Sequence, residues 1–170
     1  MDFSTSDIII QRHVKGYGWG FAKNGTDYKN GFGRIERNFF WLGLERMHEL
    51  TASGSYELEI KIKNRNINRG GTETLKWANF SVGSESTNYR LSVSGFDKGS
   101  SVIGDRLQDH NRMKFCTRDR PHCSCTRNNG DAGWWYLYGG CWQCHLNWGK
   151  SGGPQYNGYN DESTMILKLK

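Results

Sequence analysis

The residues of this 170-residue chain best suited to chemistry are five cysteines, all between positions 116 and 144. Disulfides would staple this segment in an oxidising compartment, whereas reduced thiolates would bind zinc. The zinc alternative would draw on Cys123, Cys125, Cys141 and Cys144, with His122 and His145 nearby. The spacing leaves both alternatives open, and the odd count leaves at least one thiol free in a fully oxidised monomer.

Nucleophilic or hydrolytic chemistry has little support in the sequence. The motifs H-E-x-x-H, G-x-x-x-x-G-K-[ST] and G-x-G-x-x-G are all missing. His13 and His110 have no evident nucleophile to activate, and His48 is predicted to be a packed helix residue. We therefore predict that the protein is not an enzyme.

The composition predicts one folded domain over residues 1–170. Seven Trp, eight Tyr and eight Phe supply enough apolar surface for a modest core. Apolar runs such as 8–10 and the stretch around 39–41 are far too short to span a bilayer. The formal charge of +6 favours anionic partners in a general way, but the basic residues are scattered and do not predict nucleic-acid binding.

The elements that must position these side chains can be read from hydrophobic periodicity. Apolar and charged residues alternate from Tyr56 to Lys63, which predicts a strand with one wet face and hence an antiparallel sheet. Further strands are predicted at 8–12, 74–82, 89–94 and 164–170, and helices at 24–31 and 40–50. The expected class is α+β. It comprises a sheet-and-helix scaffold over 8–95, a glycine-rich loop region over 96–163, and a return strand over 164–170.

Two ordered blocks then resemble a known family. Tyr28-Lys29-Asn30-Gly31-Phe32-Gly33 and Phe40-Trp41-Leu42-Gly43-Leu44-Glu45-Arg46-Met47-His48-Glu49-Leu50-Thr51 resemble the signature of the fibrinogen-related domain. Later blocks, including Gly133-Trp134-Trp135-Tyr136 and Leu146-Asn147, follow in the family order. The resemblance covers roughly residues 8–170.

This resemblance implies a fibrinogen C-terminal-like fold that is truncated at its N-terminal subdomain. Ficolins, tachylectins, angiopoietins, tenascins and fibrinogen chains carry such domains as secreted, non-enzymatic recognition modules. It therefore implies an extracellular protein that binds glycans, acetylated groups or a cell-surface receptor, with a role in innate immunity and a possible homo-oligomer. The first residues themselves lack the basic region of a signal peptide.

The resemblance also implies where a ligand would bind. Acetyl-binding members have a cis peptide beside a cysteine, here Gly140–Cys141, which would turn the N–H groups of Cys141 and Trp142 toward the ligand. Trp134 and Trp135 are expected in the core, and Trp142, His145 and Tyr156 near the surface. The predicted ligand-binding residues are Tyr136, Cys141, Trp142, His145, Tyr156 and Tyr159.

Metal and disulfide positions follow from the same resemblance. The calcium loop of the family has an Asp-x-Asp pair, of which Asp119 fills the first place and Pro121 the second. The loss of a carboxylate is expected to weaken calcium binding severely. The second family disulfide would join Cys125 to Cys141. Cys116, Cys123 and Cys144 have no counterpart in the family, and a Cys123–Cys144 bridge is a separate hypothesis.

Two N-x-S/T sites, at Asn24 and Asn79, are potential glycan acceptors if the protein is secreted. Two rival functions stay open at this point. One is a zinc-stabilised intracellular interaction module. The other is a degraded copy of the family domain that binds little.

Overall fold

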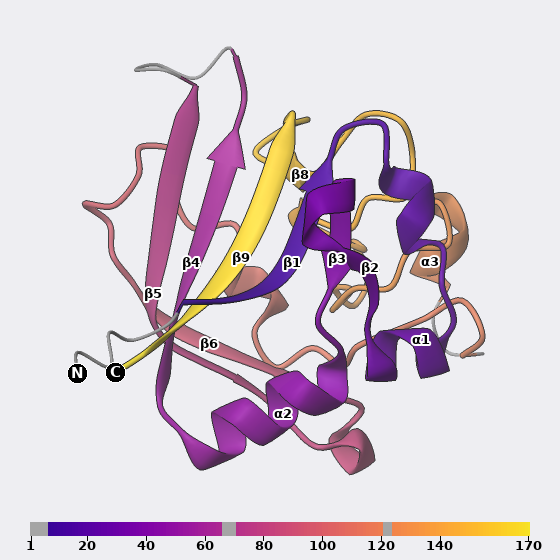
Figure 1. Ribbon diagram of the computed structural model, residues 1–170, viewed down its shortest axis with the longest axis horizontal. Helices are drawn as coiled ribbons and strands as arrows, with labels where there is room; N and C mark the ends of the chain where they lie inside the picture. Colours follow the sequence, from indigo (N-terminus) through magenta and orange to yellow (C-terminus); the bar gives the residue numbers. More distant parts are fainter. Residues whose placement is uncertain (1–6, 66–70, 121–123) are drawn as a thin grey trace.

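The fold is organised around one antiparallel sheet. A computed structural model describes residues 7–65, 71–120 and 124–170. Within them, seven strands lie in the order β2-β3-β1-β9-β4-β5-β6 (Figure 1). The strands are β1 (Ile8–Val14), β2 (Phe32–Arg34), β3 (Phe39–Trp41), β4 (Tyr56–Lys63), β5 (Thr72–Val82), β6 (Leu91–Phe96) and β9 (Glu162–Leu169). The predicted α+β class is confirmed.

The remaining elements are short. The α-helices are α1 (Gly25–Asn30), α2 (Leu44–Ser53) and α3 (Cys125–Asn128). A two-stranded sheet pairs β7 (Cys144–His145) with β8 (Gln155–Tyr156). The 3-10 turns are η1 (Gly18–Phe21), η2 (Ile35–Arg37), η3 (Glu85–Thr87) and η4 (Gln108–His110). None of the helices that the structure describes is long and apolar enough to cross a membrane.

The last strand of the chain occupies the middle of the sheet. β9 pairs with β1 on one side and with β4 on the other, both antiparallel. Its buried residues Met165 and Leu167 join the core of the scaffold. The C-terminal loops therefore form a long excursion between β6 and a strand that returns to the sheet centre (Figure 1).

The structure confirms the predicted strands and the short helix at 24–31, with ends shifted by a few residues. The predicted helix at 40–50 is wrong at its start, because Phe40 and Trp41 belong to β3. Gly43, at φ 111°, then turns the chain into α2. A φ of this sign lies outside the right-handed α-helical region, so α2 begins only after Gly43.

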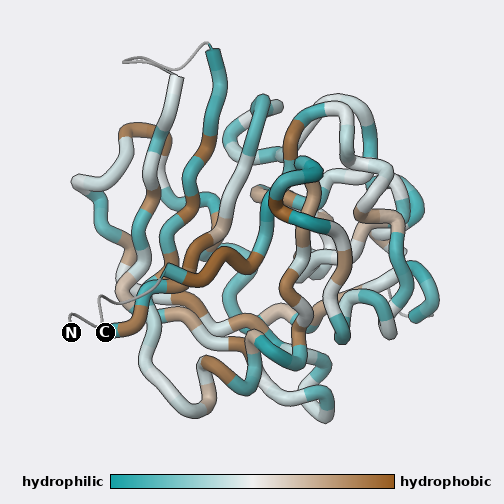
Figure 2. The backbone as a smooth tube through the Cα atoms, viewed as in Figure 1, coloured by the Kyte–Doolittle hydropathy of each residue, from teal (hydrophilic) through white to brown (hydrophobic). Residues whose placement is uncertain are grey.

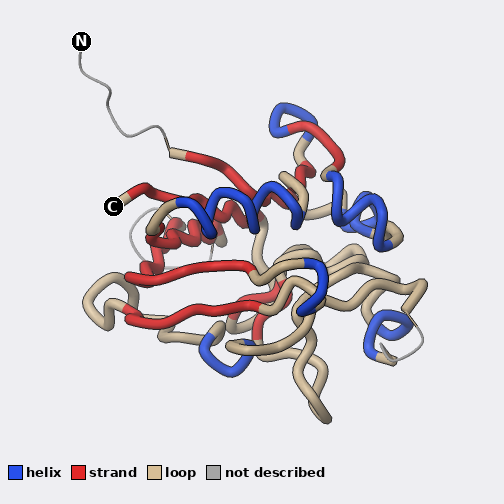
Figure 3. Tube along the Cα trace, turned by 90° about the horizontal axis from the view of Figure 1, so that it is seen from below, coloured by secondary structure: helices blue, strands red, loops and turns tan. Residues whose placement is uncertain are grey.

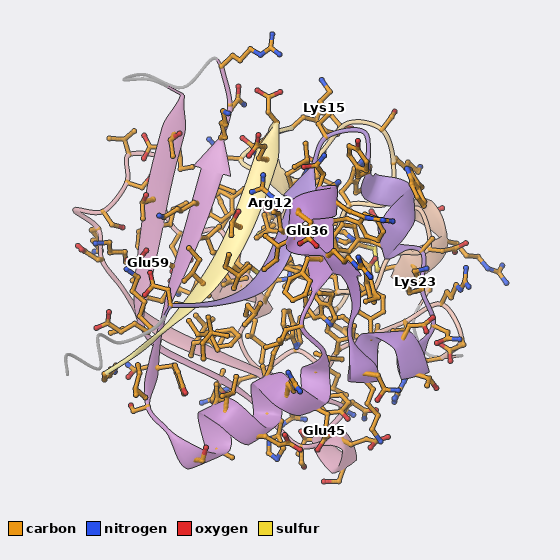
Figure 4. All side chains as sticks on the ribbon, in the orientation of Figure 1. Arg12, Lys15, Lys23, Glu36, Glu45 and Glu59 are labelled. Atoms are coloured by element: carbon orange, nitrogen blue, oxygen red, sulfur yellow. A yellow bond between two sulfur atoms is a disulfide. The ribbon has the colours of Figure 1, made fainter. Side chains whose placement is uncertain are left out.

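Glu59 on β4 also differs from its expected environment. The alternation along this strand predicts that its charged residues line the wet face, but Glu59 is only 6% exposed. The carboxylate lies 3.8 Å from Lys76 Nζ on β5 and 3.3 Å from Lys168 Nζ on β9. Figure 4 labels Glu59 on its strand. The two ammonium groups compensate for the burial of its charge.

An aromatic core joins the sheet to the loops. The ring centroids of Trp41 on β3 and Trp135 are 5.9 Å apart. Phe115 packs edge-on to Trp135, with 5.0 Å between the ring centroids. Trp134 and Trp135 are both fully buried, as predicted. Hydrophobic residues gather along the strands, whereas the loops on the other side of the molecule are mainly hydrophilic or neutral (Figure 2).

Helix α2 and the C-terminal loops are both attached to the sheet. Helix α2 lies along one face and packs against β5 (Figure 3). His48 of this helix is bonded through Nδ1 to the carbonyl of Val82 at 2.9 Å, which agrees with its predicted structural role. On β1, Gln11 Nε2 donates to the carbonyl of Leu146 at 3.1 Å and to Asn147 Oδ1 at 3.2 Å. The C-terminal loops are thus fastened to the sheet by buried polar side chains.

Candidate binding site

A disulfide closes the loop in which most predicted site residues lie. Cys125 and Cys141 are bonded, with a Cα–Cα distance of 5.6 Å, as the resemblance implied. The backbone N–H of Leu137 donates to the carbonyl of Cys141 at 2.8 Å, so 137–141 forms a small hairpin beside the bridge. The disulfide fixes the base of this hairpin to α3.

The suggested Cys123–Cys144 bridge is wrong, because Cys144 is a free and fully buried thiol. Burial raises the pKa of this thiol well above its ordinary value. Cys116 is itself disulfide-bonded, and Cys123 lies outside the described residues. The family-implied disulfide accounts for Cys125 and Cys141 only.

The zinc alternative is contradicted by the same chemistry. The disulfide removes two of the four thiolates that the zinc site would require. No group of three or more His, Cys, Asp or Glu residues suited to a metal occurs in the part of the chain that the structure describes. His122 is not among the described residues.

The expected cis peptide at Gly140–Cys141 is also wrong, since the described residues contain no cis bond. The chain turns instead through Cys141 at φ 62°. The N–H of Trp142 donates back to the carbonyl of Gly140 at 2.8 Å. One of the two predicted ligand donors is therefore used within the turn.

His145 is a core residue and not the surface residue that was predicted. Its ring stacks on Trp134 at 5.5 Å. The hydroxyl of Tyr136, which is also buried, donates to the carbonyl of Ala132, so its oxygen accepts from His145 Nε2–H at 2.9 Å. Burial holds the pKa of His145 well below its ordinary value. The imidazole is neutral, and its Nδ1 has no hydrogen-bond partner among the described residues.

Tyr156 is likewise buried, contrary to its predicted surface position. Its hydroxyl donates to the carbonyl of Gly104 at 2.7 Å and accepts from the N–H of Arg106 at 2.9 Å. This side chain binds the loop before η4 to β8. Tyr156 therefore has a structural role and is not available to a ligand.

His110 is a positioning residue that sequence reasoning missed. Its Nδ1–H donates to the carbonyl of Trp135 at 2.7 Å. Its Nε2 accepts from the N–H groups of Gln143 and Cys144 at 3.0 and 3.1 Å. One neutral imidazole therefore fixes both sides of the disulfide loop. The only sequence signal for this structural role was that His110 has no evident nucleophile to activate.

Three side chains form what we call the aromatic ledge: Trp142, Trp148 and Tyr159. Trp148 lies edge-on to Trp142 at 5.2 Å and to Tyr159 at 6.3 Å. Tyr159 is 58% exposed, Trp142 is half-buried, and Trp148 lies deeper between them. Two of the predicted ligand-binding residues thus lie together, and Trp148 is an addition that the sequence did not single out.

Internal contacts fix the ledge in place. Trp142 Nε1 donates to Asn129 Oδ1 at 2.7 Å, while Lys150 Nζ lies 5.7 Å from the centre of the Trp148 ring. Gly152 passes so close beneath Tyr159 that a Cβ there would fall 2.2 Å from the ring. The ledge is a rigid apolar surface with one open end.

Asp119 has a structural role in this chain. Its Oδ1 accepts from Thr117 Oγ1 at 2.6 Å and from the N–H of Gly25, the first residue of α1, at 2.9 Å. The hydrogen bond from Thr117 holds the pKa of the carboxyl below its ordinary value. Within the described residues no further acidic groups cluster with it, so the residues present do not fit a calcium site. Pro121 lies outside the described residues.

The two N-x-S/T sites occupy different settings. Asn24 is the N-cap of α1, where its Oδ1 accepts from the N–H of Asp27 at 2.9 Å. Asn79 is exposed on β5, with Lys170 Nζ 2.7 Å from its Oδ1. Asn24 is half-buried, and the Nδ2 of Asn79 donates to Ser94 Oγ at 3.2 Å.

Fold and site together define a non-enzymatic recognition domain, and comparison with known proteins identifies its family. The family model of the C-terminal globular domain of fibrinogen beta and gamma chains matches residues 3–166. The chain belongs to this family, whose members are non-enzymatic recognition proteins.

Individual relatives agree with this assignment. Human ficolin-3 is 32% identical over 143 residues, covering 82% of this chain and 45% of the relative. Bovine microfibril-associated glycoprotein 4 is 41% identical over 105 residues, covering 59% and 39%. The fibrinogen-like globe domain of human ANGPTL2 superposes with a TM-score of 0.80 at 28% identity, covering 95% of this chain and 79% of that domain. The chain spans less than half the length of these two curated relatives.

Proposed function

We propose that this chain is a secreted, lectin-like recognition module that binds a glycan through the aromatic ledge. The carrying observation is the edge-to-face row of Trp142, Trp148 and Tyr159 beside the Cys125–Cys141 disulfide. The similarity to extracellular proteins such as ficolin-3 supports a location outside the cell. Disulfides are stable in that compartment.

The chemistry of the ledge suits the apolar faces of sugar rings. A pyranose presents C–H groups on one face and hydroxyls at its rim, so it stacks on an aromatic ring while its rim binds polar groups. Tyr159 offers the most open ring of the ledge, and Lys150 supplies a donor over the neighbouring Trp148 ring. An acetyl group would pack its methyl in the same way, without the cis-peptide donors that were expected.

The direct test is a glycan array and an acetylated-sugar resin, probed with the wild-type chain and with Tyr159→Ala. Because this ring is 58% exposed, its removal should leave the fold intact and abolish retention. Trp19→Ala is a matched control, since Trp19 is 65% exposed on η1. Retention of Tyr159→Ala at the wild-type level would overturn the proposal. Binding of a purified cell-surface receptor, with no glycan retained, would favour the protein-partner alternative.

A degraded family copy is the second possibility, and thermal melting separates it from a working module. A recognition domain with this core should unfold in one cooperative transition. A broad, non-cooperative melt together with no retained ligand would favour the degraded copy.

Glycosylation of Asn24 and Asn79 belongs to the same proposal, because both modifications require secretion. Expression in a secretory eukaryotic host, followed by peptide mass mapping, should find glycan on both peptides. Thr26→Ala and Ser81→Ala should each remove the glycan from one site while the asparagine stays in place. A peptide found only in its unmodified mass would contradict the assignment at that site.

A further inference from the structure

A cleft with a volume of about 700 Å³ lies beside the disulfide-closed hairpin. One wall comes from segments 88–90 and 112–116, and the other from 124–125 and 136–139. This volume falls within the range of small-ligand sites. Its floor includes the buried residues Cys116 and Tyr136.

Three cations line this cleft: Arg90, Arg112 and Lys114. All three are exposed, and within the described residues none is in an ion pair. No Asp or Glu occurs among the described residues that line it. Three uncompensated charges in a concave surface concentrate positive potential there.

The cationic wall is held rigidly by the backbone. The N–H of Arg112 donates to the carbonyl of Leu91 at 2.8 Å, and the N–H of Leu91 donates to that of Met113 at 3.0 Å. The N–H of Phe115 donates to the carbonyl of Asn88 at 2.9 Å. The segment that carries two of the cations is therefore bonded to the start of β6 and to the residues before it.

The opposite wall adds an open aromatic ring. Tyr138, at the tip of the disulfide-closed hairpin, is fully exposed. The next residue, Gly139, has φ 87°, and a Cβ on Gly139 or Gly140 would meet nothing within 4 Å. The tip thus presents an unshielded ring and unobstructed backbone on the side of the cleft away from the cations.

From this arrangement we infer that the cleft is a second binding site, which takes an anionic saccharide bearing sulfate or carboxylate groups. Guanidinium and ammonium groups form charge-assisted hydrogen bonds with such anions, and Tyr138 stacks on a sugar face. A nucleic-acid strand would need a longer basic track with several aromatic platforms, and the cleft has one open ring. The site is separate from the aromatic ledge and does not depend on the function proposed for it.

The test measures the affinity of the wild-type chain for a heparin-derived hexasaccharide, a hyaluronan hexasaccharide and an uncharged maltohexaose. The first carries sulfate and carboxylate and the second carboxylate only, so their ratio identifies the anion. We expect binding of at least the first, no binding of the third, and weakening as salt is added. Absence of binding to both charged probes would overturn the inference.

The decisive variant is Arg90→Gln with Arg112→Gln and Lys114→Gln, which should weaken binding roughly 10- to 100-fold. Its matched control is Arg34→Gln with Arg37→Gln and Lys98→Gln. This control removes the same charges from exposed positions on β2, on η2 and beyond the far end of β6. Circular dichroism and melting should be unchanged in both.

Equal weakening by the two triple variants would reveal a non-specific response to net charge and would overturn the inference. The inference would also be overturned if the wild-type chain bound an oligothymidylate of the same charge as tightly as the heparin-derived hexasaccharide. Tyr138→Ala should weaken saccharide binding several-fold, whereas Tyr159→Ala should leave it unchanged. Failure of the glycan-binding proposal for the aromatic ledge would therefore leave the inference about the cleft unaffected.

Discussion

The sheet and the C-terminal loops of this chain are stabilised in different ways. In the sheet, β9 is bonded to a strand on each side, and alternate residues of β4 pack into the core. In the loops, regular structure is sparse, and shape comes from the Cys125–Cys141 disulfide and from buried polar side chains such as Gln11 and His110. In the sheet, many similar strand pairings share the stabilisation, so the loss of one contact should have a small effect. In the loops, a few individual bonds fix the conformation, so the loss of any one of them should have a large effect.

The largest effect should come from the aromatic residue that belongs to both regions. Trp135→Ala removes a fully buried ring between Trp41 and Phe115, and with it the hydrogen bond from Nε1 to the carbonyl of Tyr89 at 2.8 Å. We expect a loss of about 3 to 5 kcal/mol in the free energy of unfolding, measured by urea denaturation. A loss below about 1 kcal/mol would show that the two regions do not share a core.

Removal of the disulfide should have the next largest effect. Cys125→Ala with Cys141→Ala opens a loop with a sequence separation of 16. The free energy of unfolding should fall by roughly 3 kcal/mol, because the unfolded chain regains conformational entropy. The strand signal in far-UV circular dichroism should persist, since the sheet does not contain these residues. An unchanged urea midpoint would show that the bridge does not stabilise the loops.

Acid should weaken the attachment of the loops through the buried histidines. Burial lowers the pKa of His13 to about 4, although its Nδ1 is bonded to the carbonyl of Leu146 at 2.7 Å. An unfolded histidine binds its proton near pH 6.5, so between these values the unfolded state holds more protons. Stability is therefore complete above about pH 6.5 and falls toward pH 4, by roughly 2 to 3 kcal/mol for His13.

Urea denaturation at a series of pH values measures this slope. His13→Asn should reduce this slope without abolishing it, because burial also lowers the pKa values of His110 and His145. Equal slopes in the wild type and His13→Asn would contradict the assignment of His13.

A smaller effect is expected at the N-cap of α1. Asn24→Ala leaves the N–H of Asp27 without its acceptor and should cost about 1 kcal/mol. Asn24→Ser restores a capping oxygen and should recover most of that loss, as measured by thermal or urea unfolding. If serine and alanine are equally destabilising, the hydrogen bond is not the cause.

The sheet was largely predictable because its signal is local. Alternation from Tyr56 to Lys63 identifies β4 without any tertiary information. The strand at Phe39–Trp41 was missed because a short apolar run fits a helix as well as a strand. The start of α2 depended on the left-handed conformation of Gly43, which no periodicity reveals.

The site was less predictable because it depends on packing between distant segments. His145 and Tyr156 look like surface residues in a polar, glycine-rich stretch, yet the loops fold over them. The Cys125–Cys141 pair came from the family resemblance, since spacing alone left several pairings possible. Arg90, Arg112 and Lys114 meet only because segment 112–115 is bonded to the residues around the start of β6.

The central claim is that disulfide-fixed loops recognise ligands while the sheet only supports them. The most direct test is to compare the retention of two proteins on a glycan array: the wild-type chain and the double variant Cys125→Ala with Cys141→Ala. Circular dichroism should first show that each protein keeps its sheet. The account predicts that the wild type is retained and that the variant loses retention with its sheet intact. Equal retention of both proteins would contradict it.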